Sequence, residues 1–398
     1  FFFLRIIKQM PRPKTLLVNK LYSDEEIKGK EGHWFEESDI KYPIVSSNTD
    51  VYRVDEQGKK HLLLKFRKNC IPDDLIKVGW DSYKDLAKAS RGRGASAGPI
   101  DTEGQYWAKR KLVDTKKWST GYLNPKGLEL HDYYSPLDIS ELEQIRDELE
   151  IISKDLSKDL SKEDLMMLLI KKQGGVSKMK VNNQVASNPI GFYEEGKNFA
   201  DLPCRLTHFT RTNFEKYNEG LPFIKHIDKM FKRLIPDSHL KQLMRANTKP
   251  HLQIPKTAFS TVTINRNFRT AMHRDAGDFK GGFGNLTVIE RGKYHGGYTI
   301  FPQYGVAIDL RNNDFVAMDV HQWHCNTPMY ETEEDKKVNE SLETVFKDNP
   351  EVGTVGIYEK YTRISFVCYL REKIANCPHK SAINPQYLTK SGHSKIVV

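Results

Sequence analysis

Residues 257–279, TAFSTVTINRNFRTAMHRDAGDF, decide the fold that the sequence predicts. Polar residues alternate with apolar or β-branched ones in the first part of this stretch, which is typical of a strand. Up to residue 370, nearly every apolar segment is short and is separated from the next by Gly, Asn or Asp. These segments are AFSTVTIN, NLTVIE, YTIF, VAIDL, FVAMD and ISFVCYL. Many short strands at close spacing predict a sandwich or barrel of the jelly-roll kind.

A candidate metal site lies at the end of the first strand. His273 and Asp275 are two residues apart, so on a strand their side chains project to the same face. A second histidine, His324, follows 51 residues after His273, again beside a strand-like run. Two imidazoles and one carboxylate are the donor set of non-haem Fe(II) oxygenases. A zinc hydrolase uses the same ligand types, so the triad alone does not name the metal.

A candidate anion clamp follows at the start of the strand RISFVCYL, where Arg363 and Ser365 share one face. An arginine fork pairs bidentately with a carboxylate, and the serine hydroxyl can add a third hydrogen bond. Together with the triad upstream, the pair indicates a site that holds a dicarboxylate next to a metal.

At this point the sequence resembles the Fe(II)/2-oxoglutarate dioxygenases, most of all the TET/JBP family of nucleobase-oxidising enzymes, which includes the J-binding-protein thymine hydroxylases. The resemblance spans roughly residues 257–371 and is strongest in three segments, TAFSTVTINRNFRTAMHRDAGDF, GGYTIFPQYGVAIDLRNNDFVAMDVHQWHCNT and RISFVCYLR. It implies a double-stranded β-helix core. It also implies Fe(II) ligands and a 2-oxoglutarate clamp at matching positions: His273, Asp275, His324, Arg363 and Ser365.

The resemblance also suggests substrate residues. Asp278 stands where TET enzymes carry an asparagine that bonds the flipped base, and an aspartate there can accept thymine N3–H. Tyr369 matches a tyrosine that stacks on the base, although core packing is the alternative. Arg269 either contacts the cosubstrate or makes an ordinary ion pair. His321 competes with His324 as third ligand, but the Trp-His-x-Asn match favours His324.

The insertion between His324 and Arg363, 39 residues long, exceeds the compact hairpin of the family, and its acidic start predicts an exposed excursion. This length keeps Arg371 open as a second candidate for the clamp, although Arg371 would lack the serine partner.

Residues 50–68 predict a β-hairpin, and SRGRGASAGP at 90–99 predicts a loop, because its glycines and small residues offer little to a core. Basic residues in these two segments are candidates to contact phosphates: Lys65, Arg67, Arg91 and Arg93. A capped amphipathic helix is expected from residue 135, followed by a Gly- and Asn-rich linker at 174–189. Two more helices are expected at about 221–234 and 238–245.

The predicted fold class is therefore α+β, with a jelly-roll catalytic core and N-terminal and inserted helices packed around it. We expect four regions: an N-terminal region with the hairpin and the basic loop at 1–134, a helical segment and linker at 135–190, the dioxygenase core at 191–376, and a tail at 377–398.

Composition limits the partners and the compartment. The 398 residues include 62 Lys+Arg and 52 Asp+Glu, a net charge of +10, which favours anionic partners. No uncharged apolar run approaches the length of a membrane span. Five widely spaced cysteines without a Cys-x-x-Cys pair argue against a disulfide framework and favour a reducing, intracellular compartment, nuclear in a eukaryote or the host cytoplasm for a virus. Met10 is a candidate natural start.

The sequence thus predicts a monomeric dioxygenase, dependent on Fe(II) and 2-oxoglutarate, that hydroxylates the 5-methyl group of thymine or 5-methylcytosine in DNA, with single-stranded DNA or RNA as further candidate substrates. Two alternatives stay open. One is a prolyl- or lysyl-type protein hydroxylase, which uses the same fold and triad, and the other is a non-catalytic nucleic-acid-binding module. An ascorbate-type cosubstrate is disfavoured by Arg363 and Ser365.

Overall fold

The structure is a computed structural model that describes residues 12–86, 93–98, 185–194, 204–342 and 361–379 with their side chains, and the backbone alone of residues 89–90, 109–114 and 128–133. The helix expected from residue 135 and the candidate phosphate contact Arg91 lie outside the described residues. No helix among the described residues is long and apolar enough to cross a membrane.

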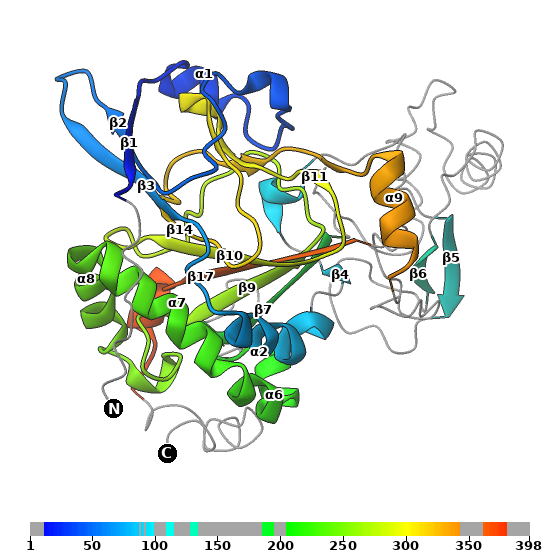
Figure 1. The fold of residues 1–398 in the computed structure, drawn as a ribbon. Helices are drawn as coiled ribbons and strands as arrows, with labels where there is room; N and C mark the ends of the chain where they lie inside the picture. The colour runs from blue at the N-terminus through cyan, green and yellow to red at the C-terminus, as the bar shows by residue number, and fades with distance from the viewer. Residues whose placement is uncertain are drawn as a thin grey trace, which may run out of the picture.

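A ten-stranded mixed sheet organises the molecule (Figure 1). Its order is β1 (Lys14–Val18), β2 (Thr49–Val54), β3 (Lys60–Arg67), β14 (Phe315–Met318), β10 (Gly284–Arg291), β17 (Thr362–Tyr369), β9 (Thr261–Arg266), β7 (Val185–Tyr193) and β4 (Ala89–Ser90), with β8 (Arg205–Leu206) paired to β7. Within this sheet β1 and β2 are parallel, and the other pairs are antiparallel. The strands expected from the alternating segments are therefore present, and the fold is mixed α+β around one large sheet.

Helices cover one face of this sheet (Figure 1). They are α2 (Asp73–Tyr83), α5 (His208–Thr212), α6 (Phe214–Glu219), α7 (Leu221–Leu234) and α8 (Pro236–Ala246), and the last two confirm the helices expected there. Even-numbered residues of β17, such as Ile364 and Phe366, are fully buried in the same apolar cluster as Phe223 and Phe231 of α7. This apolar layer packs helix α7 against the face of the sheet that carries the even-numbered residues of β17.

The opposite face of the sheet carries the smaller elements. A three-stranded sheet has the order β13 (Val306–Ile308), β12 (Thr299–Phe301) and β15 (Cys325–Asn326). A two-stranded sheet pairs β11 (His295–Gly296) with β16 (Met329–Tyr330). A separate two-stranded sheet, which is not part of this layer, pairs β5 (Lys109–Asp114) with β6 (Leu128–Tyr133). Helix α1 (Asp24–Lys28) lies near the N-terminal strands and α9 (Glu333–Glu340) follows β16 (Figure 1).

The N-terminal hairpin extends the main sheet, because β3 pairs with β14 of the oxygenase-like segment. This pairing confirms the hairpin but changes the role of its basic residues. Arg67 is 6% exposed, its Nη2 lies 2.7 Å from an Asp50 carboxylate oxygen, and Lys65 also faces Asp50, at 3.6 Å. The expectation that Arg67 contacts a phosphate is therefore wrong, because its guanidinium is buried in the fold against Asp50.

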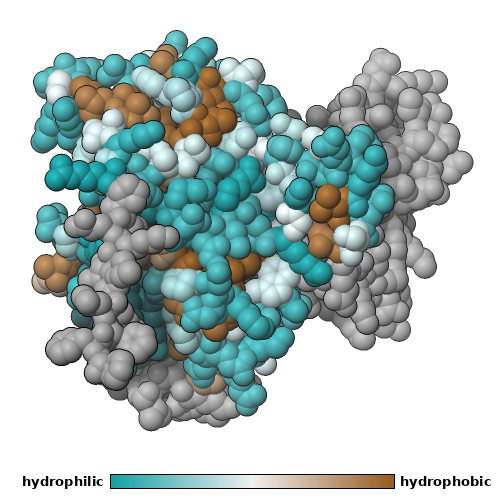
Figure 2. Space-filling model, in the orientation of Figure 1, coloured by the Kyte–Doolittle hydropathy of each residue, from teal (hydrophilic) through white to brown (hydrophobic). Residues whose placement is uncertain are grey.

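The N-terminal surface also carries apolar side chains. Figure 2 shows a largely hydrophilic face with apolar atoms gathered over the segment of β1 and α1. Leu17 in β1 and Leu21 just after it are each exposed to about two-fifths, at 41% and 42%.

Two expectations about chain organisation need correction. The linker expected at 174–189 overlaps β7, which runs through the boundary placed near residue 190 and pairs with β9 over residues 187–191. Asn188 and Pro189 suggested a turn, but Ser187, Ile190 and Phe192 are fully buried in this strand. The burial of the strand outweighs the local turn signal.

The second correction concerns the cysteines. Cys204 and Cys377 form a disulfide across 173 residues of sequence, so a disulfide is present where none was expected. It lies in a small apolar cluster with Phe192, Leu252 and Ile374. Sequence spacing could not show this pair because the two cysteines approach only through the packing of β8 against the segment after β17.

Candidate active site

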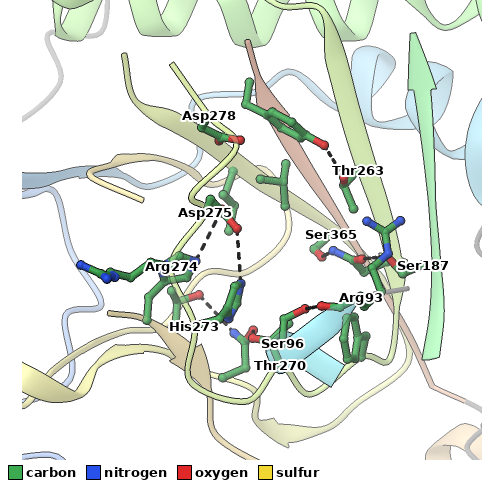
Figure 3. A pocket seen from close by; sticks show the side chains of 18 of the residues that line it. Arg93, Ser96, Ser187, Thr263, Thr270, His273, Arg274, Asp275, Asp278 and Ser365 are labelled. Carbon is green, nitrogen blue, oxygen red and sulfur yellow. Dashed lines mark hydrogen bonds and ion pairs between the residues drawn. The ribbon is translucent and has the colours of Figure 1, made fainter. Parts of the chain in front are cut away.

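Three side chains converge at one point of the polar face of the sheet. His273 Nε2 lies 3.5 Å from one Asp275 carboxylate oxygen, and His324 Nε2 lies 3.7 Å from the other. One donor atom from each residue lies within 4.8 Å of the other two. Figure 3 shows His273 and Asp275 turned toward each other in the pocket. The expected triad is therefore assembled with the spacing of a possible metal site.

Backbone pairing brings the triad together. His273 and His324 exchange two backbone hydrogen bonds, each 3.0 Å from N to O, across an isolated antiparallel bridge. The backbone N–H of Asp275 donates to Val320 O at 3.0 Å. The two chain segments, 51 residues apart, are thereby held side by side before any ligand binds.

Each histidine has one ring nitrogen occupied by a backbone carbonyl. His273 Nδ1 lies 2.8 Å from Ala271 O and His324 Nδ1 lies 2.9 Å from Gln322 O, so each Nδ1–H donates and each Nε2 is left as the electron-pair donor. Burial, with the adjacent His273 ring, lowers the pKa of His324 to about 4, which keeps this imidazole neutral. His321 instead contacts Phe279 O through Nε2, so the competing ligand assignment is not supported.

The triad lines a cavity of about 420 Å³. Its wall includes Arg363, Ser365, Val367 and Tyr369, the odd-numbered residues of β17, whose even-numbered neighbours pack against the helices. The alternation predicted for this strand therefore sorts its two faces as expected.

Arg363 is the strongest evidence that the cavity binds an anion. The residue is 4% exposed, yet its Nε and Nη2 have no hydrogen-bond partner among the described residues. Burial lowers its pKa to about 10, and the nearby Glu290 opposes this effect, so the side chain remains a cation at neutral pH. A buried guanidinium with two free donors fits a carboxylate, which accepts two parallel N–H bonds. The residues present thus fit a carboxylate-bearing cosubstrate next to a metal.

A row of polar side chains forms the floor beside Arg363, and two of its members, Ser187 and Asn265, were not singled out from the sequence. Ser187, Asn265 and Ser365 stand directly opposite one another on β7, β9 and β17. Ser187 Oγ donates to Asn265 Oδ1 at 2.5 Å, and Asn265 Nδ2 donates to Ser365 Oγ at 3.2 Å. Alternation along TVTINR could have placed Asn265 on the pocket face, but its partners depend on strand register.

Asp278 and Tyr369 lie together on the cavity wall. Asp278 is 8% exposed and its Oδ2 has no hydrogen-bond partner among the described residues. Burial, reinforced by the negative charge of Asp275, raises the pKa of Asp278 well above its usual value. The Tyr369 hydroxyl bonds Thr263 Oγ1 at 3.1 Å, which anchors the ring from its far end.

Arg371 belongs to this wall and not to the clamp. Its Nε and Nη2 donate to the two carboxylate oxygens of Glu194, Nη2 at 2.6 Å, and its guanidinium lies 5.4 Å from the Tyr193 ring centroid. Its Nη1 also reaches the Tyr369 hydroxyl at 3.5 Å. Because Glu194 already occupies this fork, the assignment of the clamp to Arg363 is favoured.

The basic loop before β5 contributes one of its arginines to the cavity. Arg93 lines the pocket beside Ser96, whose carbonyl accepts a hydrogen bond from Ala271 N at 2.9 Å (Figure 3). The loop was expected to contribute nothing to a core, but Ala97 is fully buried. Gly98 has φ +73° and lies against the Trp34 ring so closely that a Cβ would overlap it, so only glycine fits.

Arg269 does not line the cavity. Its Nη2 donates to Phe35 O at 2.8 Å and pairs with Glu36 at 2.6 Å, while the guanidinium lies over the Trp34 ring. Of the two roles weighed for this residue, the structure supports the ion pair and not the cosubstrate contact.

Two imidazoles and a carboxylate at one point are the donor set of the non-haem iron oxygenase class, and the same cavity contains the buried Arg363. Residues 188–372 match the family model described as the oxygenase domain of the 2OGFeDO superfamily, the TET/JBP model. The match confirms the family resemblance that the sequence motifs indicated.

Named relatives support the same family. The bifunctional helicase and thymine dioxygenase JBP2 of Leishmania major is 34% identical over 182 residues, which are 46% of this chain and 14% of that protein. Thymine dioxygenase JBP1 of Trypanosoma brucei brucei is 32% identical over 190 residues, 48% of this chain and 21% of that protein. The chain thus spans only a small part of the length of these relatives.

Among solved structures, NgTET1 in complex with 5mC DNA is similar with a TM-score of 0.42 and 9% identity, covering 97% of this chain and 92% of that chain.

Proposed function

We propose that this chain is an Fe(II)- and 2-oxoglutarate-dependent dioxygenase that hydroxylates the 5-methyl group of a pyrimidine base in DNA. The observation that carries the proposal is a single cavity that holds both the histidine and aspartate triad and the Arg363 guanidinium, whose Nε and Nη2 have no partner among the described residues. When bound, iron and 2-oxoglutarate would supply an O₂-dependent oxidation in which one oxygen atom enters the methyl C–H bond and the other enters succinate as CO₂ leaves.

The protein's own residues provide binding and orientation. His273, His324 and Asp275 would hold the metal, and the backbone bonds to both Nδ1 atoms aim the imidazoles before binding. Arg363 would pair with the distal carboxylate of 2-oxoglutarate and Ser365 would add a hydroxyl donor. Because Arg363 and the triad line the same cavity, one cosubstrate molecule held by Arg363 would also be within the site that the triad lines.

The substrate base would have to leave the helix, because a methyl group inside a duplex cannot reach a buried metal. Tyr369 offers an aromatic ring on the cavity wall, and stacking on it would offset part of the unstacking cost, which is a few kcal/mol. Asp278 offers a free carboxyl oxygen that can accept thymine N3–H. We infer thymine before 5-methylcytosine, which agrees with the names of the trypanosomatid relatives.

Arg93, on the cavity wall, is the described basic residue best placed to contact a phosphate next to the flipped nucleotide. Lys65 lies 3.6 Å from Asp50 and would remain able to contact a phosphate. Arg67 is buried in its ion pair with Asp50 and is therefore not proposed as a phosphate contact. The main sheet and the small sheet of β13, β12 and β15 both contribute to the pocket lining, which supports a double-stranded β-helix core.

The test is incubation of the chain with Fe(II), 2-oxoglutarate and duplex DNA that contains both thymine and 5-methylcytosine, followed by nucleoside mass spectrometry. A new 5-hydroxymethyl nucleoside is expected, and it should be absent with the His324→Ala variant. Parallel reactions with proline- and lysine-rich peptides test the protein hydroxylase alternative, and succinate release with peptide but not with DNA would overturn the proposal.

A further inference from the structure

A row of three buried polar side chains crosses the pocket floor at right angles to the strands. Ser187, Asn265 and Ser365 are directly paired across β7, β9 and β17, and their exposed fractions are 0%, 7% and 7%. Directly opposed residues on one face of a sheet are the pairs whose side chains interact most closely. Because Ser365 is also the neighbour of Arg363, this row ends at the anion clamp.

The hydrogen bonds in the row have a direction. Ser187 Oγ donates its only hydrogen to Asn265 Oδ1, so the amide group of Asn265 turns its nitrogen toward β17. Asn265 Nδ2 then donates to Ser365 Oγ. A hydroxyl that accepts in this way still has its own hydrogen to give, and a buried hydroxyl needs a partner for it.

We propose that Asn265 is a positioning residue that sets Ser365 as a hydrogen-bond donor to the distal carboxylate of the cosubstrate, with Ser187 fixing the orientation of the Asn265 amide. The inference rests on the proposed function, in which 2-oxoglutarate is that cosubstrate. If the Asn265 amide were reversed, its Oδ1 would accept the Ser365 hydrogen. Ser365 Oγ would then turn a lone pair, and not a hydrogen, toward the carboxylate of the cosubstrate. Ser187 and Asn265 therefore determine whether Ser365 donates a hydrogen bond to the cosubstrate carboxylate, and they act through Ser365.

The test compares Asn265→Asp with Asn265→Ala, by titrating 2-oxoglutarate calorimetrically into the full chain loaded with Mn(II), so that binding is measured without turnover. Aspartate keeps the shape of asparagine but replaces the amide donor by an acceptor that takes the Ser365 hydrogen. We expect Asn265→Asp to weaken 2-oxoglutarate binding by about thirtyfold and Asn265→Ala by about fivefold, in line with the loss of a hydrogen bond to a charged group.

The test depends on which variant binds 2-oxoglutarate more weakly. If Asn265 had only a structural role, the isosteric Asn265→Asp would weaken binding less than Asn265→Ala. Mn(II) affinity should stay within about twofold of wild type in both variants, since Asn265 is not a metal ligand. In the Ser365→Ala background, Asn265→Asp should lose most of its effect, because no hydroxyl remains to be oriented.

Asn285→Asp is the matched control. Asn285 is fully buried on the neighbouring strand β10, but it does not line the cavity, and its Nδ2 bonds Phe283 O at 2.9 Å. It measures what a new buried carboxylate does to folding alone, and we expect its 2-oxoglutarate affinity to remain at the wild-type value even if its melting temperature falls.

The outcomes separate the two proposals. If the Mn(II)-loaded wild-type chain shows no saturable 2-oxoglutarate binding, the proposed function fails. If wild type binds but Asn265→Asp binds equally well, or binds more tightly than Asn265→Ala, the positioning role of Asn265 is wrong while the proposed function stands.

Discussion

Arg363→Met should stabilise the ligand-free protein while abolishing its response to 2-oxoglutarate. Arg363 is 4% exposed and two of its nitrogens are without partners among the described residues. A buried donor without a partner costs about 1–3 kcal/mol, and methionine fills a similar length without that cost.

The gain is reduced because Glu290 loses a nearby positive charge, and burial already raises the pKa of Glu290. Arg311 remains within 3.6 Å of Glu290, so the carboxylate keeps one cationic partner. We therefore expect a net stabilisation of about 1 kcal/mol, which for a chain of this size corresponds to a rise of about 1–2 °C in melting temperature.

The ligand response should change in the opposite sense. At a 2-oxoglutarate concentration of about 100 times Kd, the wild-type chain with Mn(II) should gain about 2.7 kcal/mol from binding alone. The variant should gain nothing at the same concentration, because two charge-assisted hydrogen bonds to the carboxylate are lost. Thermal unfolding with and without 2-oxoglutarate measures both effects in one assay.

Arg67→Met is the matched control for this experiment. Arg67 is as deeply buried as Arg363, but it pairs with Asp50 and donates to Phe66 O at 2.8 Å. Its loss should destabilise the protein by about 2–3 kcal/mol and leave the 2-oxoglutarate response intact. If Arg363→Met destabilises the protein as Arg67→Met does and the variant still responds to 2-oxoglutarate, the assignment of Arg363 as an anion clamp is refuted.

Three further predictions concern the triad, the disulfide and the pocket wall. His324→Ala should lower Mn(II) affinity at least a hundredfold by titration calorimetry, whereas His321→Ala should change it less than threefold; equal losses would contradict the ligand assignment. Cys204→Ala should lower the free energy of unfolding in urea by about 2–4 kcal/mol under non-reducing conditions, and no change would mean that the disulfide does not form in solution. Glu194→Gln should cost about 1–2 kcal/mol at pH 7 by breaking the Arg371 pair. Burial raises the pKa of Glu194, but the hydrogen bond from Arg371 outweighs it and leaves the pKa lowered, so this stabilisation is present above the unfolded pKa and is lost as pH falls through the folded one. The difference between Glu194→Gln and wild type should therefore shrink in acid, and a difference that grows there would contradict the pairing.

Two pairs of site residues could be predicted from sequence because each pair lies within a single segment: His273 with Asp275, and Arg363 with Ser365. Arg363 and Ser365 share one face of β17, so a strand assignment was enough to orient them. His273 and Asp275 instead lie beyond β9, which ends at Arg266, and the backbone bridge between His273 and His324 holds them in place. Joining them into one site required the family resemblance, since nothing in the spacing shows that His324 pairs with His273 across the backbone.

What the sequence did not reveal depends on which distant segments become neighbours. The Ser187 and Asn265 contact follows from the register of β7 on β9, and the Cys204 and Cys377 pair from packing across 173 residues. The same holds for Arg67, which the sequence offered as a phosphate contact. The pairing of β3 with β2 brings Arg67 next to Asp50, and the two form an ion pair. Local patterns fix the face on which a residue lies, whereas register and packing fix its partner.

The most direct test of the central claim is the stoichiometry of turnover with thymine-containing DNA. The account predicts one succinate for each 5-hydroxymethyl nucleoside formed, with both products lost together in the His324→Ala variant. Succinate formed without any change in the nucleosides, or products that persist in the His324→Ala variant, would contradict the claim that one pocket couples 2-oxoglutarate to the oxidation of a DNA base.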